Sequence, residues 1–390
     1  METIDCAIIG GGPAGLMAAE RLAAAGRQVT VFDRMPSLGR KFLLAGRGGL
    51  NITHSESMER FIGHYGSAAA ALAPALEGFG PEALRAWCAE LGETTVVGSS
   101  GRVFPASFKA TPLLRAWLRR LAGQGVATRL KHRWVGWDAD GALQFETADG
   151  AVRIRAGATL LAMGGASWPR LGSDGAWAEV LRADGVEVTP LRASNVGVLR
   201  AWSDHFRERF AGSPLKRLTG TVGGVSANGE AVVTARGLEG GLIYALGRPI
   251  REAIEREGTA VLTLDLRPDL DELTLRRRMG GAGVSRANGW RRAGLSPAAA
   301  GLLREIGSER GSSPKRVTLE LTGLAQIDRA ISTAGGVGLD GLEAGFRLRG
   351  RADVFAAGEM LDWDAPTGGY LMQACFSTGW HAAGAILAGC

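Results

Sequence analysis

Three glycines and one aspartate near the start of the chain have the residue types and the spacing needed to bind a dinucleotide. Gly10, Gly12 and Gly15 form a G-x-G-x-x-G pattern, and Asp33 follows 18 residues after the last glycine. In this pattern the first glycine permits a tight turn, the second lets a diphosphate approach the backbone, and the third lets a helix pack closely on a strand. A carboxylate at the position of Asp33 accepts hydrogen bonds from an adenosine ribose.

A strand, a helix and a second strand must position these residues. The apolar run 6–9 predicts the first strand, the alanine-rich segment after Pro13 and Ala14 predicts the helix, and the apolar run 29–32 predicts the second strand. Free N–H groups at the start of the helix, together with the positive end of its dipole, then face the phosphates. A glycine turn in another kind of strand–helix unit is the alternative. The first strand, the helix, the second strand and the acidic residue all agree with dinucleotide binding, however.

The segment after the second strand has the composition of a loop that wraps an anionic group. Residues 34–54 combine glycines with four cations, Arg34, Arg40, Lys41 and Arg47. Such a segment is poor core material, whereas its free N–H groups and cations suit a bound anion. We therefore predict that Arg34, Arg40 and Lys41 bind the cofactor. A flexible surface loop is the alternative interpretation.

Two of these motifs resemble a known family. The sequence GGGPAG at 10–15 with Asp33, and the sequence GRKFLLAGRGGLNITH at 39–54, are similar to motifs of bacterial YhiN/BaiN-like flavoproteins, also described as aminoacetone-oxidase-like FAD enzymes. The resemblance runs from residue 6 to about residue 385. It implies an α/β fold with an FAD-binding Rossmann domain of the glutathione-reductase type.

The family's Gly-Gly-Arg-Cys-Asn-x-Thr segment is only partly retained. Arg47, Asn51 and Thr53 are present, but Leu50 occupies the cysteine position, so a role that needs the thiol is lost. The resemblance places Arg47 and Asn51 near the isoalloxazine ring. These two residues are therefore predicted to be the polar groups on the substrate side.

Further FAD contacts are implied by the resemblance in the middle of the chain. Short strand-like runs between residues 126 and 161 are typical of the β-meander in this type of FAD domain, and the backbone near Trp134 is expected to meet the adenine. The run 158–163 then enters a turn at Gly164. A buried strand that ends in a glycine turn would give the same pattern without any cofactor.

The last FAD contacts are implied near the C-terminus. A strand ends at Glu359, whose carboxylate resembles the group that binds the ribityl hydroxyls. The final helix begins at Gly368 and Gly369, and its first N–H groups can point at the flavin N1/O2 edge, although any helix with a glycine start would look alike. The remaining residues predicted to bind the cofactor are Gly358, Leu371 and Met372.

The pattern of predicted strands and helices changes around Pro190. We predict that residues 1–190 and 326–390 form a discontinuous FAD-binding domain, and that residues 191–325 form an inserted β-barrel and helical domain over the flavin. The family's Thr-His-x-Gly-x-Ser-Gly-Pro segment is altered here, since Thr234 remains but Ala235 takes the histidine position. The chain therefore resembles a divergent branch of the family.

Composition limits the classes of function. The chain has 46% hydrophobic and 22% charged residues and a net charge of +6, with arginines scattered along it, so neither nucleic acid nor membrane is expected as a partner. The four cysteines show no metal-ligand or disulfide spacing, which favours a reducing compartment and no metal site. No basic segment precedes an apolar run at the N-terminus, so we expect a cytoplasmic protein. The oligomeric state stays open.

These observations predict an FAD-dependent oxidoreductase that transfers a hydride through flavin N5 to or from a small organic substrate. The family implies two chemistries, reduction of an enone-type double bond or oxidation of an amine, and the five histidines form no recognisable dyad that would choose between them. A flavin-dependent RNA-modifying or RNA-binding protein is the alternative. Because no second G-x-G-x-x-G unit exists, NAD(P)H is expected only as a transient electron donor.

Overall fold

The computed structural model describes residues 1–280, 284–307 and 313–389. The chain divides into two compact units, of which unit 1 contains residues 1–192 and 332–390 and unit 2 contains residues 193–331. These limits lie within six residues of the boundaries expected from the sequence. Cys390, one of the four cysteines, falls outside the described residues.

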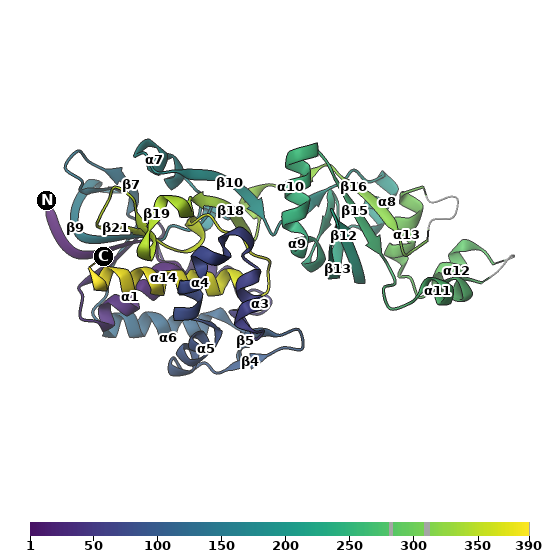
Figure 1. Ribbon diagram of the computed structural model, residues 1–390, viewed down its shortest axis with the longest axis horizontal. Helices are drawn as coiled ribbons and strands as arrows, with labels where there is room; N and C mark the ends of the chain where they lie inside the picture. Colours follow the sequence, from purple (N-terminus) through teal and green to yellow (C-terminus); the bar gives the residue numbers. More distant parts are fainter. Residues whose placement is uncertain (281–283, 308–312, 390) are drawn as a thin grey trace. The chain divides into compact units, whose positions relative to one another are not determined.

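A parallel sheet forms the centre of unit 1, with the strand order β21-β9-β1-β2-β6. Its strands β9 and β21 lie near the N-terminus in Figure 1. The strands are β1 (Glu2–Ile9), β2 (Val29–Asp33), β6 (Ala127–Leu130), β9 (Gly150–Leu161) and β21 (Val354–Ala356). The buried ends of β1 and β9 and the whole of β21 are continuous runs without charged residues, because both faces of a parallel sheet are covered there. The predicted Rossmann-type α/β fold is confirmed.

Antiparallel strands extend this sheet at two places. The predicted meander is present, since β7 pairs with β8 and β8 pairs with the first half of β9, while β19 and β20 form an edge hairpin beside β21. A separate small sheet has the order β3-β5-β4. The bounds are β3 (Thr53–His54), β4 (Thr95–Val97), β5 (Arg102–Pro105), β7 (Arg133–Trp137), β8 (Leu143–Thr147), β19 (Leu342–Glu343) and β20 (Arg347–Leu348).

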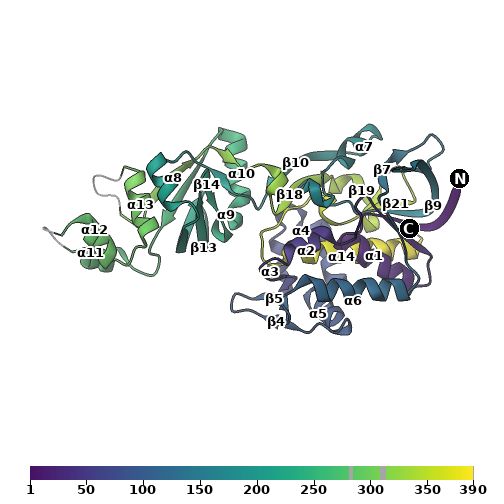
Figure 2. The same cartoon turned by 180° about the vertical axis from the view of Figure 1, so that it is seen from behind.

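Helices cover the sheet of unit 1, and α1, α14 and α6 lie together in both views (Figure 2). The helices are α1 (Pro13–Ala24), α2 (Arg40–Ala45), α3 (Met58–Gly63), α4 (Ala69–Gly78), α5 (Pro81–Glu90), α6 (Ala110–Gly123), α7 (Trp177–Ala183) and α14 (Tyr370–Ala388). Short 3₁₀ helices are η1 (Gly66–Ala68), η2 (Pro169–Leu171), η3 (Ile327–Arg329), η4 (Leu339–Gly341), η5 (Ala344–Phe346) and η6 (Gly358–Met360). Of these, η3 belongs to unit 2.

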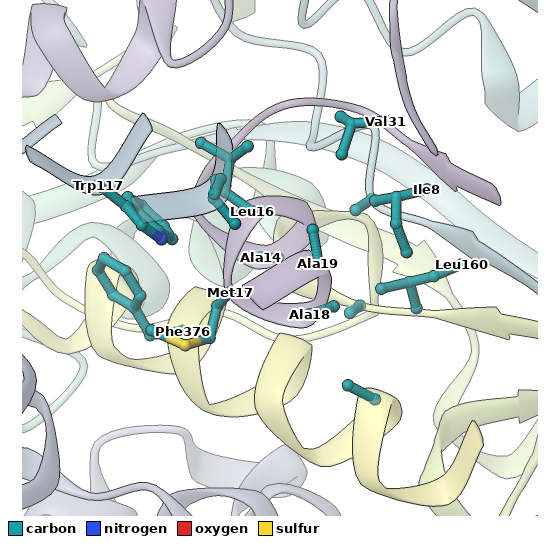
Figure 3. Packing of buried hydrophobic residues seen from close by; sticks show 14 of the residues in the cluster. Ile8, Ala14, Leu16, Met17, Ala18, Ala19, Val31, Trp117, Leu160 and Phe376 are labelled. Atoms are coloured by element: carbon teal, nitrogen blue, oxygen red, sulfur yellow. The ribbon is translucent and has the colours of Figure 1, made fainter. Parts of the chain in front are cut away.

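The core between sheet and helices fixes where α1 and α14 begin. Ile8 from β1 and Leu160 from β9 face the buried side of α1, and Phe376 of α14 packs beside Trp117 of α6 with ring centroids 5.4 Å apart (Figure 3). The two helices touch so closely that a Cβ at Gly379 would lie 2.1 Å from the carbonyl oxygen of Ala14. A larger residue at position 379 would therefore separate the helices.

Unit 2 begins and ends beside a pair of strands. The chain leaves unit 1 within β10 (Val188–Ser194) and returns at β18 (Ser332–Val337), and these two strands form a two-stranded sheet. Inside unit 2, the N–H of Ile331 donates to the carbonyl oxygen of Asn195 at 3.2 Å. The first and last residues of the insert are therefore neighbours in space.

Unit 2 is built on an antiparallel sheet with the linear order β16-β15-β12-β13-β14-β11-β17. The strands are β11 (Val198–Leu199), β12 (Pro214–Val222), β13 (Val225–Thr234), β14 (Gly237–Glu239), β15 (Ala260–Asp265), β16 (Val317–Leu321) and β17 (Gly323–Leu324). The sequence predicts a β-barrel for this part of the insert, whereas the described strands pair in a linear order that begins at β16 and ends at β17. Alternate residues of its strands are buried, as expected for a sheet with one covered face.

Helices α9 and α10 pack on this sheet, and α13 packs on α8 through Phe210 and Gly301. The helices are α8 (Asp204–Phe210), α9 (Gly241–Ala245), α10 (Gly247–Glu257), α11 (Glu272–Met279), α12 (Arg286–Arg292) and α13 (Pro297–Glu305). By sequence, residues 193–331 contain 21 Lys and Arg against 15 Asp and Glu, whereas the rest of the chain contains 24 of each. All of the net charge of +6 therefore lies in the insert.

Within the described part of the chain, no helix is both long and apolar enough to cross a membrane.

Candidate functional site

The glycine turn between β1 and α1 has the geometry that a bound diphosphate needs. Gly10 has φ +113°, and a Cβ at Gly15 would lie 2.0 Å from the Gly10 carbonyl oxygen, so both positions require glycine. A Cβ at Gly12 would instead meet nothing within 4 Å. Gly12 caps α1 and Pro13 is its first residue, so the free N–H groups of the first turn face an open space.

Asp33 closes β2 and holds this turn from the side. Its Oδ2 accepts a hydrogen bond of 2.8 Å from the N–H of Gly11, and its Oδ1 accepts one of 2.8 Å from the N–H of Met35. Burial raises the pKa of Asp33, and the two N–H groups partly oppose that shift. The carboxylate therefore organises the turn.

Arg40 gives a direct test of whether an anionic cofactor fits. The Nε atom of Arg40 is buried and has no hydrogen-bond partner among the described residues, while its Nη1 donates to Ser37 at 3.2 Å. Arg40 also lies near enough to Asp33 to lower the pKa of that carboxyl. A buried unpaired guanidinium N–H beside an open glycine turn fits a bound diphosphate, so these residues suit FAD.

The backbone next to Trp134, which is predicted to meet the adenine, is held beside the end of β2. The N–H of Lys131 donates to the Met35 carbonyl oxygen at 3.2 Å, and the N–H of His132 donates to the Asp33 carbonyl oxygen at 3.0 Å. The chain before β7 thus runs along the end of β2. The side chain of Trp134 itself is 6% exposed, packs edge-on against Trp137 and belongs to the core.

Glu359 lies at the centre of the polar groups that the structure brings together. Its Oε2 accepts from Lys41 Nζ at 2.7 Å and from the N–H of Gly165 at 3.3 Å, and its Oε1 accepts from the N–H of Thr333 at 3.0 Å. Lys41 Nζ also reaches the hydroxyl of Ser167 at 2.6 Å. Three segments far apart in sequence therefore meet at this carboxylate.

Gly164 and Gly358 shape the backbone around Glu359. Both have positive φ, at +72° and +82°, and a Cβ at Gly358 would lie 2.8 Å from the Cβ of Ala14. Trp177 donates through Nε1 to the Gly164 carbonyl oxygen at 2.9 Å. Gly358 therefore lets the end of β21 approach the start of α1.

The first turn of α14 also begins at glycine. Gly368 and Gly369 have φ +133° and +102°, and a Cβ at Gly369 would lie 2.4 Å from the carbonyl oxygen of Thr53. Leu371 and Met372 follow in the first turn and are both partly exposed. The backbone N–H groups of this turn have no partner within the helix, which makes the turn suitable for an electron-rich ring edge.

Four side chains that the sequence did not group meet at this turn. Tyr370 Oη donates to Glu56 Oε1 at 2.6 Å, and His64 Nε2 lies 3.0 Å from the same oxygen. The ring of His54 stacks on Tyr370 with centroids 5.6 Å apart and an interplanar angle of 22°. His54 and His64 thus lie on the same carboxylate, a grouping that the sequence did not reveal.

Arg47 and Asn51, predicted to face the substrate, differ in their surroundings. Arg47 is exposed, whereas the side-chain amide of Asn51 donates to the carbonyl oxygens of Thr53 at 2.9 Å and Val103 at 3.0 Å. Asn51 therefore fixes the path of its own loop. Leu50 is fully buried in the core, which explains why an apolar residue is stable at the family's cysteine position.

Arg34, the remaining predicted cofactor ligand, forms an ion pair with Asp174. Its guanidinium is thus held at the end of β2 by the loop before α7. Among the described residues, no group of His, Cys, Asp and Glu side chains could hold a metal ion.

The fold and this site define a Rossmann-type FAD-dependent oxidoreductase. Residues 4–385 match the family described as HI0933-like protein Rossmann domain, and the chain belongs to this family. The resemblance to YhiN/BaiN-like flavoproteins is thereby confirmed, and FAD is the cofactor.

Two curated relatives match parts of the chain. A ribosomal RNA dihydrouridine synthase of Haemophilus influenzae is 27% identical over 236 residues, which are 60% of this chain and 58% of that protein. A thiamine thiazole synthase of Desulfosudis oleivorans is 58% identical over 36 residues, which are 9% of this chain and 14% of that protein. The chain thus spans less than two thirds of the length of these relatives.

Solved flavoenzyme structures share the fold. A 3-ketosteroid Δ1-dehydrogenase from Sterolibacterium denitrificans matches over 100% of both chains with a TM-score of 0.55 and 12% identity. A flavocytochrome c3 fumarate reductase matches 98% of this chain and 78% of that chain, with a TM-score of 0.54 and 14% identity. At these identities the likeness concerns the fold alone.

Proposed function

We propose that the chain is a reductase that saturates a carbon–carbon double bond conjugated with a carbonyl group. FAD, when bound, supplies the hydride at its N5 atom. This proposal selects the enone-reductase branch of the sequence prediction over the amine-oxidase branch.

The similarity to the ribosomal RNA dihydrouridine synthase carries this proposal. Dihydrouridine differs from uridine by two hydrogens added across a ring double bond that is conjugated with a carbonyl group. A conjugated double bond accepts a hydride because the carbonyl group withdraws the electron pair that the hydride displaces. The same type of bond occurs in small enones.

The residues of this chain bind and orient the cofactor in the proposed reaction. Gly12 and the first N–H groups of α1 bind the diphosphate, Asp33 binds the ribose, and Glu359 binds the ribityl chain. The first turn of α14 after Gly369 would hold the N1/O2 edge, where its N–H groups and the positive end of the helix dipole would favour negative charge on the flavin. Arg47 is exposed and is the remaining candidate for contact with substrate.

A small conjugated carbonyl compound is the first candidate substrate. Unit 1 carries equal numbers of cationic and anionic side chains, so its surface has no net charge to attract a polyanion. A small neutral substrate needs no such attraction. A cytoplasmic location, where such metabolites occur, belongs to the same proposal.

RNA is the second candidate substrate, and one specific observation favours it. The whole net charge of +6 lies in residues 193–331, and α11 and α12 contribute Arg276, Arg277, Arg278, Arg291 and Arg292 to it. A cationic unit joined to a neutral catalytic unit could hold an RNA strand through its phosphates. In that case the reduced double bond belongs to a uracil ring.

Anaerobic stopped-flow mixing tests the chemistry and separates the substrates. The flavin of the purified holoprotein is photoreduced without NAD(P)H and mixed with a small enone, with free uridine, or with unmodified ribosomal RNA. Return of the flavin absorbance with an added mass of 2 Da in the product supports the proposal. Bleaching of the oxidised flavin by an amine, with no reoxidation by any of the three, would show that the oxidase branch is right.

A salt series then decides between the two substrate classes. Reoxidation by RNA should slow steeply as salt increases, because phosphate contacts release counterions, whereas reoxidation by a neutral enone should not. Reduction by NADPH is expected to be slow. Saturable reduction at micromolar NADPH would contradict the expectation that NAD(P)H acts only transiently.

A further inference from the structure

The cluster of His54, Glu56, His64 and Tyr370 has no part in the reaction proposed above, and we propose that it couples proton binding at His64 to reduction of the flavin. Glu56 is the positioning residue, and it acts on the flavin through the first turn of α14. This inference rests on the proposed function only in placing the N1/O2 edge of FAD at that turn.

The cluster is attached to the start of α14 by direct contacts. Tyr370 is the first residue of the helix, and its hydroxyl donates to Glu56 at 2.6 Å. Tyr65, fully buried, donates through its hydroxyl to the Tyr370 carbonyl oxygen at 2.8 Å. Both the side chain and the backbone of Tyr370 are therefore held, so the charge of Glu56 stays at a fixed place beside the helix start.

Contacts and exposure distinguish His64 from His54. Both ring nitrogens of His54 have backbone partners, because Nδ1 accepts from the N–H of Glu56 at 3.3 Å and Nε2 lies 2.9 Å from the Ser100 carbonyl oxygen. His64 Nε2 faces Glu56 at 3.0 Å, and its side chain is 37% exposed against 16% for His54. His64 can therefore exchange protons with solvent.

The other groups that face the cluster leave Glu56 as its main negative charge. Arg102 of β5 lies near Tyr370 and acts to lower the pKa of its phenol, but burial and the bond to Glu56 outweigh this and raise that pKa. Burial also raises the pKa of Tyr65 and of the Cys375 thiol on α14. Both phenols and the thiol therefore stay neutral near pH 7.

The sign of the coupling follows from the charges. Reduction adds negative charge to the ring edge at the start of α14, and the carboxylate of Glu56 repels that charge. When His64 binds a proton, it compensates Glu56, and reduction becomes more favourable. The reduction potential should therefore rise on acidification by more than the flavin's own proton uptake produces.

Spectroelectrochemical titration of the FAD holoprotein between pH 5.5 and pH 8.5 tests this coupling without any substrate. His64→Gln should make the flavin about three to ten times harder to reduce at pH 6, as judged by the equilibrium constant, and should leave it unchanged at pH 8.5. Glu56→Gln should have the opposite sign and make reduction three to ten times easier at pH 8.5. A tenfold change corresponds to about 30 mV for a two-electron couple.

Two further variants separate electrostatics from packing. Tyr370→Phe keeps the aromatic packing and removes only the hydroxyl, so it should change the pH dependence while the thermal melting curve remains cooperative. Glu59→Gln is the matched control, since Glu59 is an exposed carboxylate on the neighbouring α3. Its potential should equal that of the wild type at every pH.

Equal shifts for His64→Gln and Glu56→Gln at all pH values would overturn the coupling and indicate a structural role. Potentials identical to the wild type in both variants would overturn it as well. Failure to reduce any enone or RNA would instead refute the proposed function and leave these potentials measurable. The two proposals can therefore fail separately.

Discussion

The start of α1 and the start of α14 are both expected to face FAD, but they are built in different ways. At α1 the helix start presents backbone N–H groups, since Gly12 opens onto free space, and the permanently charged guanidinium of Arg40 lies beside the turn. At α14 the corresponding turn is surrounded by side chains, with Tyr370 between Glu56 and the two histidines. The two helices pack directly against each other.

This difference matches the two tasks. A diphosphate has a constant charge, and fixed N–H groups with a helix dipole are sufficient to bind it. The ring edge of a flavin changes its charge during the reaction, so titratable side chains beside α14 can respond to that change whereas backbone groups cannot. Backbone N–H groups therefore serve to bind the diphosphate at α1, and side chains serve to adjust the reduction potential of the flavin at α14.

The largest expected effect on stability comes from adding a side chain at the close contact between Gly369 and the backbone of Thr53. Gly369→Ala forces a side chain at φ +102° into the backbone of Thr53, so it should lower the free energy of unfolding by about 3 kcal/mol. Urea denaturation of the apoprotein measures this loss. Gly63→Ala is the control, because its Cβ meets nothing within 4 Å; an equal loss in both variants would contradict the argument.

The second effect breaks the α1 side of the comparison. Gly12→Ala places a methyl group where nothing in the protein opposes it, but where a diphosphate would lie. The apoprotein should melt at the wild-type temperature, while FAD affinity should fall at least about tenfold, or 1.4 kcal/mol, in a fluorescence titration. Wild-type FAD affinity would show that the diphosphate does not approach Gly12.

A smaller effect isolates the clamp at α14. Tyr370→Phe removes one hydrogen bond to Glu56 and should cost about 1 kcal/mol of stability, with little change in FAD affinity. Thermal melting and FAD titration measure the two quantities. If FAD affinity fell as far as in Gly12→Ala, the side-chain cluster would bind the cofactor instead of tuning it.

The smallest effect concerns pH and the contact between the two helices. Burial, with a contribution from Arg21 of α1, lowers the pKa of His381 on α14. The unfolded state therefore binds more protons as pH falls below about 6.5, the ordinary histidine value, so stability should decrease on acidification. His381→Gln should flatten this part of the curve of unfolding free energy between pH 7.5 and pH 5; an unchanged curve would assign the decrease to other groups.

The part of the site that the sequence predicts well is local. Gly10, Gly12, Gly15 and Asp33 lie within one strand–helix–strand unit, and each has a conformational or chemical requirement that its residue type reveals. Even there one role was missed. Asp33 accepts hydrogen bonds from two backbone N–H groups. Replacing it by alanine would therefore loosen the turn as well as weaken FAD binding.

The parts that could not be predicted depend on contacts between distant segments. His54 and His64 show no motif, because the residue that joins them to the helix, Tyr370, lies about 300 positions later in the chain. The family resemblance predicts that Asn51 contacts the substrate. In the structure its side-chain amide donates to two backbone carbonyl oxygens that only the folded loop brings near. The only local signal in the sequence was that His54 precedes the acidic residue Glu56 by two positions.

The bond between Ile331 and Asn195 has a consequence for how this chain could be changed or could have arisen. Because the insert starts and ends at adjacent points, its 139 residues can be removed or exchanged at the cost of closing only a short loop. An FAD-binding domain whose insert begins and ends at adjacent points can accept a different inserted domain without disturbing its own sheet. The chain is thus suited to recombination, in which one FAD-binding scaffold acquires new specificity by exchanging a single cassette.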